Sequence, residues 1–267
     1  MNSKKKLALS GTLRYNHGSI FYCTEATDLK KTLGILGGLG PMATAYLYEQ
    51  ITRMTDAASD QAHMEILLSS HPAIPDRTAF LLGQSTADPV PELIATGRRL
   101  VNAGAQVLAV PCVTAHAMYG RFAPQLGAPV IRAVRETAAY LKGAGVQRVG
   151  LLATTGTLQT GTLHRALESV GISVCQPSPV GQAKIMDVIY RDVKAGNAAN
   201  MADFSAAADE LRAMGAQVLL LGCTELSVVK RDNPLGTGYL DVLDVLAMCA
   251  VRECGYPLKG EFENLIR

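Results

Sequence analysis

The sequence predicts an α/β protein made of two pseudo-symmetric halves, each a parallel sheet with helices, that face each other across a cleft. Short apolar runs of strand length alternate with longer segments of helical periodicity, which is typical of parallel α/β architecture. An internal repeat also aligns GAQVLAVPC at 104–112 with GAQVLLLGC at 215–223, and the glycine-containing segments 34–40 and 150–156 open the two copies. We therefore expect both halves to share one topology.

Each element follows from a local pattern. Residues 1–30 lack sustained periodicity and are expected to form a tail. Helical spacing precedes Gly104 and Gly215, so two helices should end at these glycines. Buried strands are expected at the apolar runs 33–36, 66–68, 107–110, 149–152 and 218–221. We expect a first domain of residues 31–133 plus 237–267 and a second domain of residues 134–236.

Composition excludes several classes of protein. The 267 residues are 48% hydrophobic and 18% charged, which is unlike a disordered chain. A formal net charge of +2 gives no reason to expect nucleic acid or a membrane surface as partner. No apolar run approaches the roughly 18 residues of a membrane span, and Ser10 and Gly11 interrupt the only candidate signal segment. The six dispersed cysteines form no CxxC metal pair, so we expect a reduced, cytoplasmic protein without a metal site.

Both copies of the repeat end in a cysteine, Cys112 or Cys223, directly after a buried strand. Open α/β sheets bind ligands at this edge, so two facing halves would present two thiols to one cleft. A helix N-terminus can lower a thiol pKa from about 8.5. One thiolate could then remove a proton while the opposite thiol supplies one, as inversion at a carbon requires. A single cysteine after a strand is more often a packing residue, but the matching positions favour a catalytic pair.

Two residues close behind the cysteines could tune them. His116 follows Cys112 by four residues, and Glu225 follows Cys223 by two. Either residue could adjust the charge of the neighbouring thiol. Packing or helix capping is an equally good explanation for both.

Five short motifs occur in order: GGLGP at 37–41, IPDRT at 74–78, PCVTAH at 111–116, LATTGT at 152–157 and GCTE at 222–225. Together they resemble the aspartate/glutamate racemase family, and its aspartate racemase branch most closely. The resemblance covers about residues 31–250. It implies two pseudo-symmetric α/β domains around a cleft, a homodimer, and racemization of a small acidic amino acid by a cysteine pair without a cofactor.

The resemblance assigns roles to individual residues. It implies that Cys112 and Cys223 are acid and base on opposite faces of Cα. Thr114 and Thr224 match positions that hold the substrate's α-carboxylate together with backbone N–H groups. Two more substrate-binding positions lie in the glycine-rich and threonine-rich motifs, namely Leu39 and Thr154.

Two cations are expected to meet the side-chain carboxylate of the substrate. Arg77 matches the family's arginine, and Lys184, within QAKIMDVIY at 182–190, matches its second cationic partner. An arginine fork and a lysine around one carboxylate offset the cost of its desolvation. The alternative for each is an ordinary surface ion pair.

One position departs from the family's pattern and leaves the substrate open. Val113 follows the first cysteine, where the family has an asparagine whose amide touches the polar groups of the amino acid. A valine offers no hydrogen bond there. The substrate is therefore aspartate, glutamate or a related acid.

Three other functions stay open. Residues 38–43, GLGPMA, match the fingerprint of a dinucleotide-binding oxidoreductase. The second strand, however, ends in SSHP at 69–72, without the acidic residue that binds the ribose. A small-acid isomerase or decarboxylase would use the same thiols, and Val113 also allows a weakly active homologue that binds an acid as a sensor.

Overall fold

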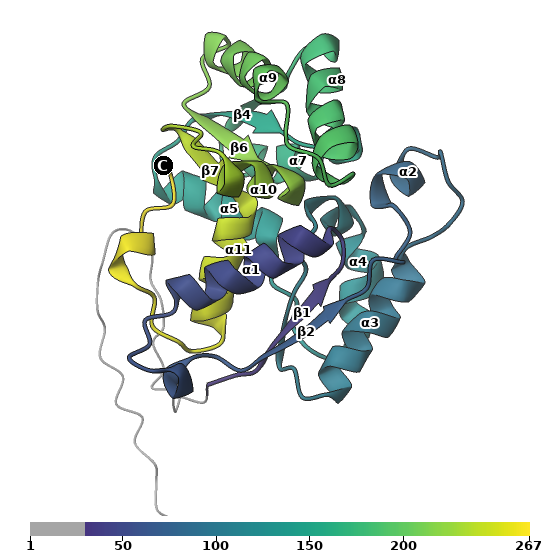
Figure 1. Cartoon of the computed structure of the whole chain (residues 1–267), viewed down its shortest axis with the longest axis vertical. Coiled ribbons are helices and arrows are strands. Elements are labelled where there is room, and N and C mark those ends of the chain that lie inside the picture. The colour runs from purple at the N-terminus through teal and green to yellow at the C-terminus, as the bar shows by residue number, and fades with distance from the viewer. Residues whose placement is uncertain (1–29) are drawn as a thin grey trace, which may run out of the picture.

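The computed structural model describes residues 30–267 and has an α/β fold with two parallel sheets (Figure 1). The first sheet has strand order β2-β1-β3 and the second β5-β4-β6-β7. Their strands are β1 Leu33–Gly37, β2 Ile66–Ser70, β3 Val107–Ala109, β4 Arg148–Leu152, β5 Ser173–Cys175, β6 Val218–Leu221 and β7 Tyr239–Asp241. The predicted fold class is confirmed. The tail expected at 1–30, apart from Lys30, and Cys23 lie outside the described residues.

Helices connect successive strands, as parallel pairing requires. Their bounds are α1 Pro41–Met54, α2 Arg77–Leu81, α3 Val90–Asn102, α4 Tyr119–Phe122, α5 Ala133–Gly143, α6 Thr155–Thr160, α7 Thr162–Glu168, α8 Pro179–Asp187, α9 Met201–Ala213, α10 Thr224–Asp232 and α11 Val242–Glu253. Two segments of other helical geometry contribute to the site described below: the 3-10 segment η2 Val113–Met118 and the π-helical segment η4 Val188–Val193.

All five predicted strands are present, and β1, β3 and β6 are buried along their whole length. In the first sheet Leu33 is aligned with Ile66 on one side and Val107 on the other. The sequence pattern does not predict β5 and β7, because runs of three residues are too short to show a period. β7 pairs with β6 in the second sheet, although we expected all of 237–267 in the first domain.

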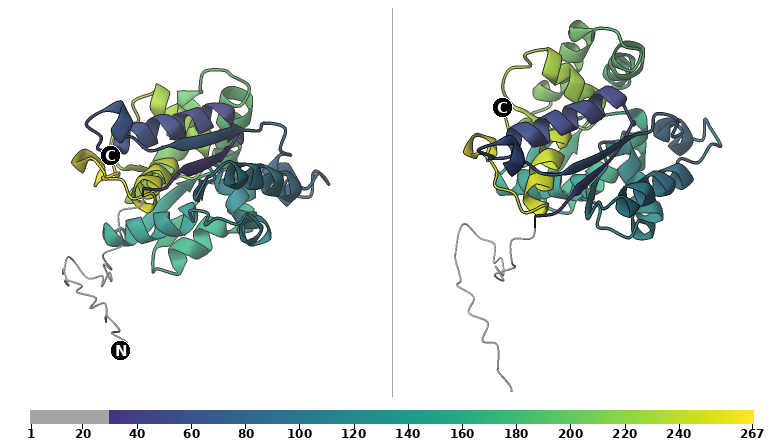
Figure 2. Two further views of the ribbon diagram at one scale, coloured as in Figure 1. Left: turned by 90° about the horizontal axis from the view of Figure 1, so that it is seen from below. Right: turned by 60° about the horizontal axis from the view of Figure 1, so that its bottom comes forward.

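Helix α11 joins the two halves. It packs against α1 of the first half and against α5, and both views in Figure 2 show the purple α1 beside the yellow α11. One hydrophobic cluster contains Leu33 of β1, Leu151 of β4 and Leu246 of α11. The C-terminal segment therefore contributes a strand to the second half and a helix to the core between the halves.

Buried charges anchor α10, the helix that follows Cys223. Lys230 forms ion pairs with Asp244 and, at 3.5 Å, with Asp241. Ser227 donates a 2.8 Å hydrogen bond to Asp241. Removing one partner from a buried charge cluster usually costs several kcal/mol, so these contacts fix α10 relative to β7 and α11.

The turn between β1 and α1 requires glycine at two positions. Gly38 and Gly40 have φ angles of +90° and +80°, which side chains with a Cβ rarely adopt. A Cβ at Gly38 would also lie 2.3 Å from the backbone nitrogen of His71. This close approach between chain segments gives GGLGP a packing role of its own.

None of the helices in the described part of the chain has the length and apolar character needed to cross a bilayer.

Candidate active site

The two cysteines meet at the carboxyl ends of the strands. Cys112 follows β3 and is the N-cap residue of η2, whereas Cys223 follows β6 and is the N-cap residue of α10. Their exposed fractions are only 6% and 5%. Both line one narrow inner pocket of about 10 Å³, which is room for about one water molecule. The two halves of the repeat thus place their thiols at a common point.

The inner pocket also collects most of the other residues singled out in the sequence. Besides the two cysteines, its lining includes Leu39, Arg77, Val113, Thr114, Thr154, Thr224 and Glu225. These residues come from both halves and from five of the strand-to-helix connections. Lys184 and His116 are not part of this lining.

A larger cavity of about 460 Å³ lies outside the inner pocket. The two share four charged residues, Asp76, Arg77, Lys194 and Glu225. The route from the outer cavity to the thiols therefore passes between two carboxylates and two cations.

Glu225 keeps a proton on Cys223. The thiol donates a 2.9 Å hydrogen bond to Glu225 Oε2, which also accepts from the Thr224 hydroxyl at 3.4 Å. Burial, followed by the negative charge of Glu225, raises the pKa of Cys223 well above its ordinary value. In this state Cys223 is a proton donor.

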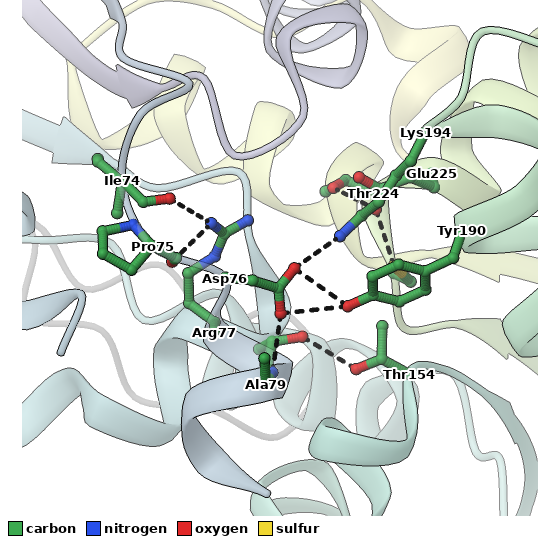
Figure 3. A network of polar contacts seen from close by, with 12 residues as sticks. Ile74, Pro75, Asp76, Arg77, Ala79, Thr154, Tyr190, Lys194, Thr224 and Glu225 are labelled. Atoms are coloured by element: carbon green, nitrogen blue, oxygen red, sulfur yellow. Dashed lines mark hydrogen bonds and ion pairs between the residues drawn. The ribbon is translucent and has the colours of Figure 1, made fainter. Parts of the chain in front are cut away.

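Arg77 is the cation beside Cys112. Its Nη1 donates to the carbonyls of Ile74 at 3.1 Å and Pro75 at 3.0 Å, which orients the guanidinium (Figure 3). Burial alone would lower the pKa of Arg77, but interaction with the Cys112 sulfur outweighs this and leaves the pKa raised. The Nε atom is buried and has no hydrogen-bond partner among the described residues. The guanidinium thus retains a donor that a bound anion could use.

Lys194 is the second cation of the site, a residue that the sequence analysis missed. Its ammonium lies 3.3 Å from Asp76 Oδ2 and 4.0 Å from the centre of the Tyr190 ring. Tyr190 donates to Asp76 at 3.2 Å, so both residues of the second half meet this carboxylate of the first half (Figure 3). Burial opposes the charge on Lys194, but Glu225 and Cys223 outweigh it and raise the pKa of Lys194.

The structure does not bring Lys184 to the pocket. Its ammonium pairs with Asp203 of α9 at 3.2 Å, and both side chains are partly exposed. The chain between Lys184 and Lys194 passes from α8 into the π-helical η4, which places Lys194 in the lining of the outer cavity and Tyr190 in contact with Asp76. Lys184 therefore forms a surface ion pair, which is the alternative that the sequence left open for it.

Three buried hydroxyls form a cluster across the two halves. Thr114 lies 3.1 Å from Thr154 and 3.0 Å from Thr157, oxygen to oxygen, and Thr154 lies 3.1 Å from Thr157. A hydroxyl can rotate to donate or accept. The cluster can therefore turn donors toward a carboxylate in the inner pocket.

Val113 and His116 belong to the packing around Cys112. Val113 is 4% exposed and joins the main hydrophobic cluster while one side lines the pocket. His116 donates from Nε2 to the Val110 carbonyl at 3.3 Å. Burial, with a smaller contribution from Arg132, lowers the pKa of His116 to about 4. His116 is therefore neutral, and among the described contacts its hydrogen bond goes to the backbone rather than to a thiol.

Comparisons with known proteins all indicate the same family. The family described as Asp/Glu/Hydantoin racemase matches residues 36–250. The chain is 28% identical to Picrophilus torridus aspartate racemase, with a TM-score of 0.75 over 87% of this chain and 98% of that one. It is 27% identical to the broad specificity amino-acid racemase RacX of Bacillus subtilis, over 53% of this chain and 63% of the relative. Glutamate racemase from Francisella tularensis, solved with D-glutamate, shares the fold. It is 15% identical to this chain, with a TM-score of 0.58 over 85% of this chain and 82% of that one.

Proposed function

Because the chain belongs to the Asp/Glu/Hydantoin racemase family, we propose that it racemises a small acidic amino acid, with Cys112 and Cys223 as acid and base on opposite faces of Cα. The observation that carries this proposal is the shared inner pocket. Two thiols from equivalent positions of the two halves line it, and both are buried. A pair of proton-transfer groups that approach from different sides is what inversion at one carbon requires.

The different neighbours of the two thiols suggest one direction of the reaction. Cys223 donates a hydrogen bond to Glu225, and Arg77 is the cation that interacts with Cys112. The Cys112 thiolate takes the proton from Cα, and Cys223 delivers its proton to the opposite face. The bond to the first hydrogen breaks as the bond to the second forms. Afterwards Cys112 carries the proton and Cys223 the charge, which is the starting state for the other enantiomer.

The charges at the pocket favour a dicarboxylic amino acid. Arg77 and Lys194 can meet the side-chain carboxylate, with Lys194 in the role that the sequence suggested for Lys184. We expected Thr114 and Thr224 to hold the α-carboxylate; the 3.1 Å contact between the Thr114 and Thr154 hydroxyls supports a proposal that Thr154 joins them. An inner pocket of about 10 Å³ cannot hold an amino acid, so substrate enters when the two halves separate.

The oxidoreductase alternative receives less support. Gly38 lies close to the backbone of His71. Packing alone therefore explains why this position of the dinucleotide-binding fingerprint is a glycine. A cytoplasmic location and a homodimer stay predictions.

Incubating the purified protein with L- and D-amino acids in D₂O, without added cofactor, tests the proposal. We expect an acidic amino acid to lose optical purity while deuterium enters at Cα of the product enantiomer. Absence of both changes for every acidic amino acid would contradict a racemase. A product other than the enantiomer would indicate an isomerase or decarboxylase, and binding of NAD would revive the oxidoreductase.

A further inference from the structure

One oxygen of the Glu225 carboxylate has no partner. Oε2 accepts from Cys223 and Thr224, whereas Oε1 is buried and makes no hydrogen bond to any described residue. The side chain is only 5% exposed. A buried carboxylate oxygen without a donor costs free energy, so this position calls for a hydrogen-bond donor that arrives with a ligand.

Glu225 lies where the inner pocket and the outer cavity meet, because it lines both. Its Oε1 faces the backbone of Gly40, where a Cβ would come within 2.8 Å of the oxygen. Gly40 lines the outer cavity as well. A side chain at this turn would collide with Oε1, so the glycine leaves room beside the carboxylate.

An amino acid brings an ammonium group that needs an acceptor close to Cα. Among the residues lining the inner pocket, the cations Arg77 and Lys194 cannot accept, and Val113 has no polar atom. The other carboxylate of the lining, Asp76, already accepts from Ala79, Tyr190 and Lys194. Glu225 is the carboxylate of this lining with an acceptor to spare.

We propose that Glu225 Oε1 binds the α-ammonium group of the substrate and thereby distinguishes an amino acid from a dicarboxylic acid without nitrogen. The inference rests on the proposed function, since it assumes that an acidic amino acid enters this pocket. It also explains how the site dispenses with an amide at Val113: the acceptor comes from the second half of the molecule instead of the residue after the first cysteine.

The same contact would link binding to chemistry. The charge of Glu225, after burial, raises the pKa of Cys223. An ammonium on Oε1 compensates that charge, which makes it easier for Cys223 to deliver its proton to Cα while Cys112 takes the proton from the opposite face. Diacids that lack nitrogen leave Glu225 with Lys194 as its cationic neighbour and leave Oε1 without a donor.

Binding measurements separate this role from a merely structural one. Calorimetric titration in a Cys112→Ala background, which blocks turnover, gives dissociation constants for L-aspartate with succinate, and for L-glutamate with glutarate. In each pair the two acids have the same carboxylates and differ by the ammonium. With Glu225 intact, the amino acid of at least one pair should bind more tightly than its diacid. Adding Glu225→Gln should weaken that amino acid by about 10- to 100-fold and leave the diacid unchanged or tighter.

Asp232→Asn is the matched control, because it removes a carboxylate from the exposed end of the same helix, where Asp232 pairs with Arg231. It should preserve the preference for the amino acid. An equal loss for both members of a pair in Glu225→Gln, or no loss, would overturn the inference. So would equal binding of amino acid and diacid with Glu225 intact, a result that does not depend on any Glu225 variant folding. Turnover by the wild-type protein in D₂O tests the proposed function separately, since racemization could persist with the ammonium bound elsewhere.

Discussion

The charged residues at the mouth of the inner pocket sort into those held by protein partners and those with capacity left for a ligand. Asp76 accepts from a backbone N–H, a tyrosine and a lysine, and these contacts outweigh burial and lower its pKa. Arg77 keeps a buried Nε donor, and Glu225 keeps a free Oε1. The unused donor and acceptor match the carboxylate and the ammonium of an acidic amino acid.

Lys194 and Lys184 form a natural pair of test positions. We expect Lys194→Met to lower kcat/KM for aspartate or glutamate by about 30-fold or more, since losing one partner of a buried charge pair costs about 2 to 5 kcal/mol. Lys184→Met removes the same charge from an exposed pair with Asp203 and should change kcat/KM by less than about threefold. Steady-state kinetics with both enantiomers decides between them. A larger effect of Lys184→Met would show that Lys184, and not Lys194, is the second cation that binds the substrate.

Val113→Asn tests whether the site lacks an amide. If Glu225 accepts the ammonium, an added Asn should not raise kcat/KM on aspartate by more than about threefold. Because Val113 also packs in the main hydrophobic cluster, burying an amide there should lower the free energy of unfolding by about 1 to 3 kcal/mol. Kinetics and urea unfolding measure the two effects. A gain in activity of tenfold or more would show that the amide is the missing contact.

The short helical segments, more than the strands, determine which side chains reach the pocket. η2 begins at Val113 and directs Thr114 to the hydroxyl cluster, while His116 turns to the backbone. The π-helical η4 brings Tyr190 to Asp76 and ends next to Lys194. Each extra residue in a helical turn rotates the side chains that follow it, so η4 sets the direction from which the second cation approaches.

The environment of His116 in η2 predicts a pH dependence of stability. The folded-state pKa of about 4 lies below the ordinary 6.5, so the unfolded chain binds a proton that the folded chain excludes. Stability contributed by the neutral ring is present above pH 6.5 and is lost as the pH falls toward 4. Between pH 7 and pH 4.5 the neutral His116 should cost the wild type about 2 to 3 kcal/mol of its free energy of unfolding. The His116→Gln variant should not show this part of the loss. Urea unfolding at the two pH values measures it, and equal losses in wild type and variant would refute the assignment.

The sequence predicted the parts of the site that lie close to strand ends. Cys112, Thr154 and Cys223 follow apolar runs that are unmistakable as strands, and the carboxyl edge of a parallel sheet brings such positions together. Lys194 could not be found in this way, because it lies beyond two helical segments and no strand fixes its position. Tyr190 and Lys194 are four residues apart, a helical spacing, but nothing local indicates that this face meets Asp76.

The two halves are joined by a core and meet at a narrow site. α11 packs against α1 and α5, whereas the site side is bridged by Asp76 with Tyr190 and Lys194. On the proposed function we expect a substrate to displace this bridge, because the inner pocket has room for about one water.

The division of labour between the two thiols is tested most directly by following racemization and Cα deuterium exchange in D₂O for Cys112→Ala and Cys223→Ala. Each enantiomer is supplied separately, and Cys249→Ala, a buried cysteine of α11 outside the inner pocket, is the control. Both site variants should lose racemization by at least about 100-fold, and any exchange that survives should occur with one enantiomer only, a different one in each variant. Cys249→Ala should racemise like the wild type. Racemization at the wild-type rate without either Cys112 or Cys223 would contradict the two-thiol mechanism.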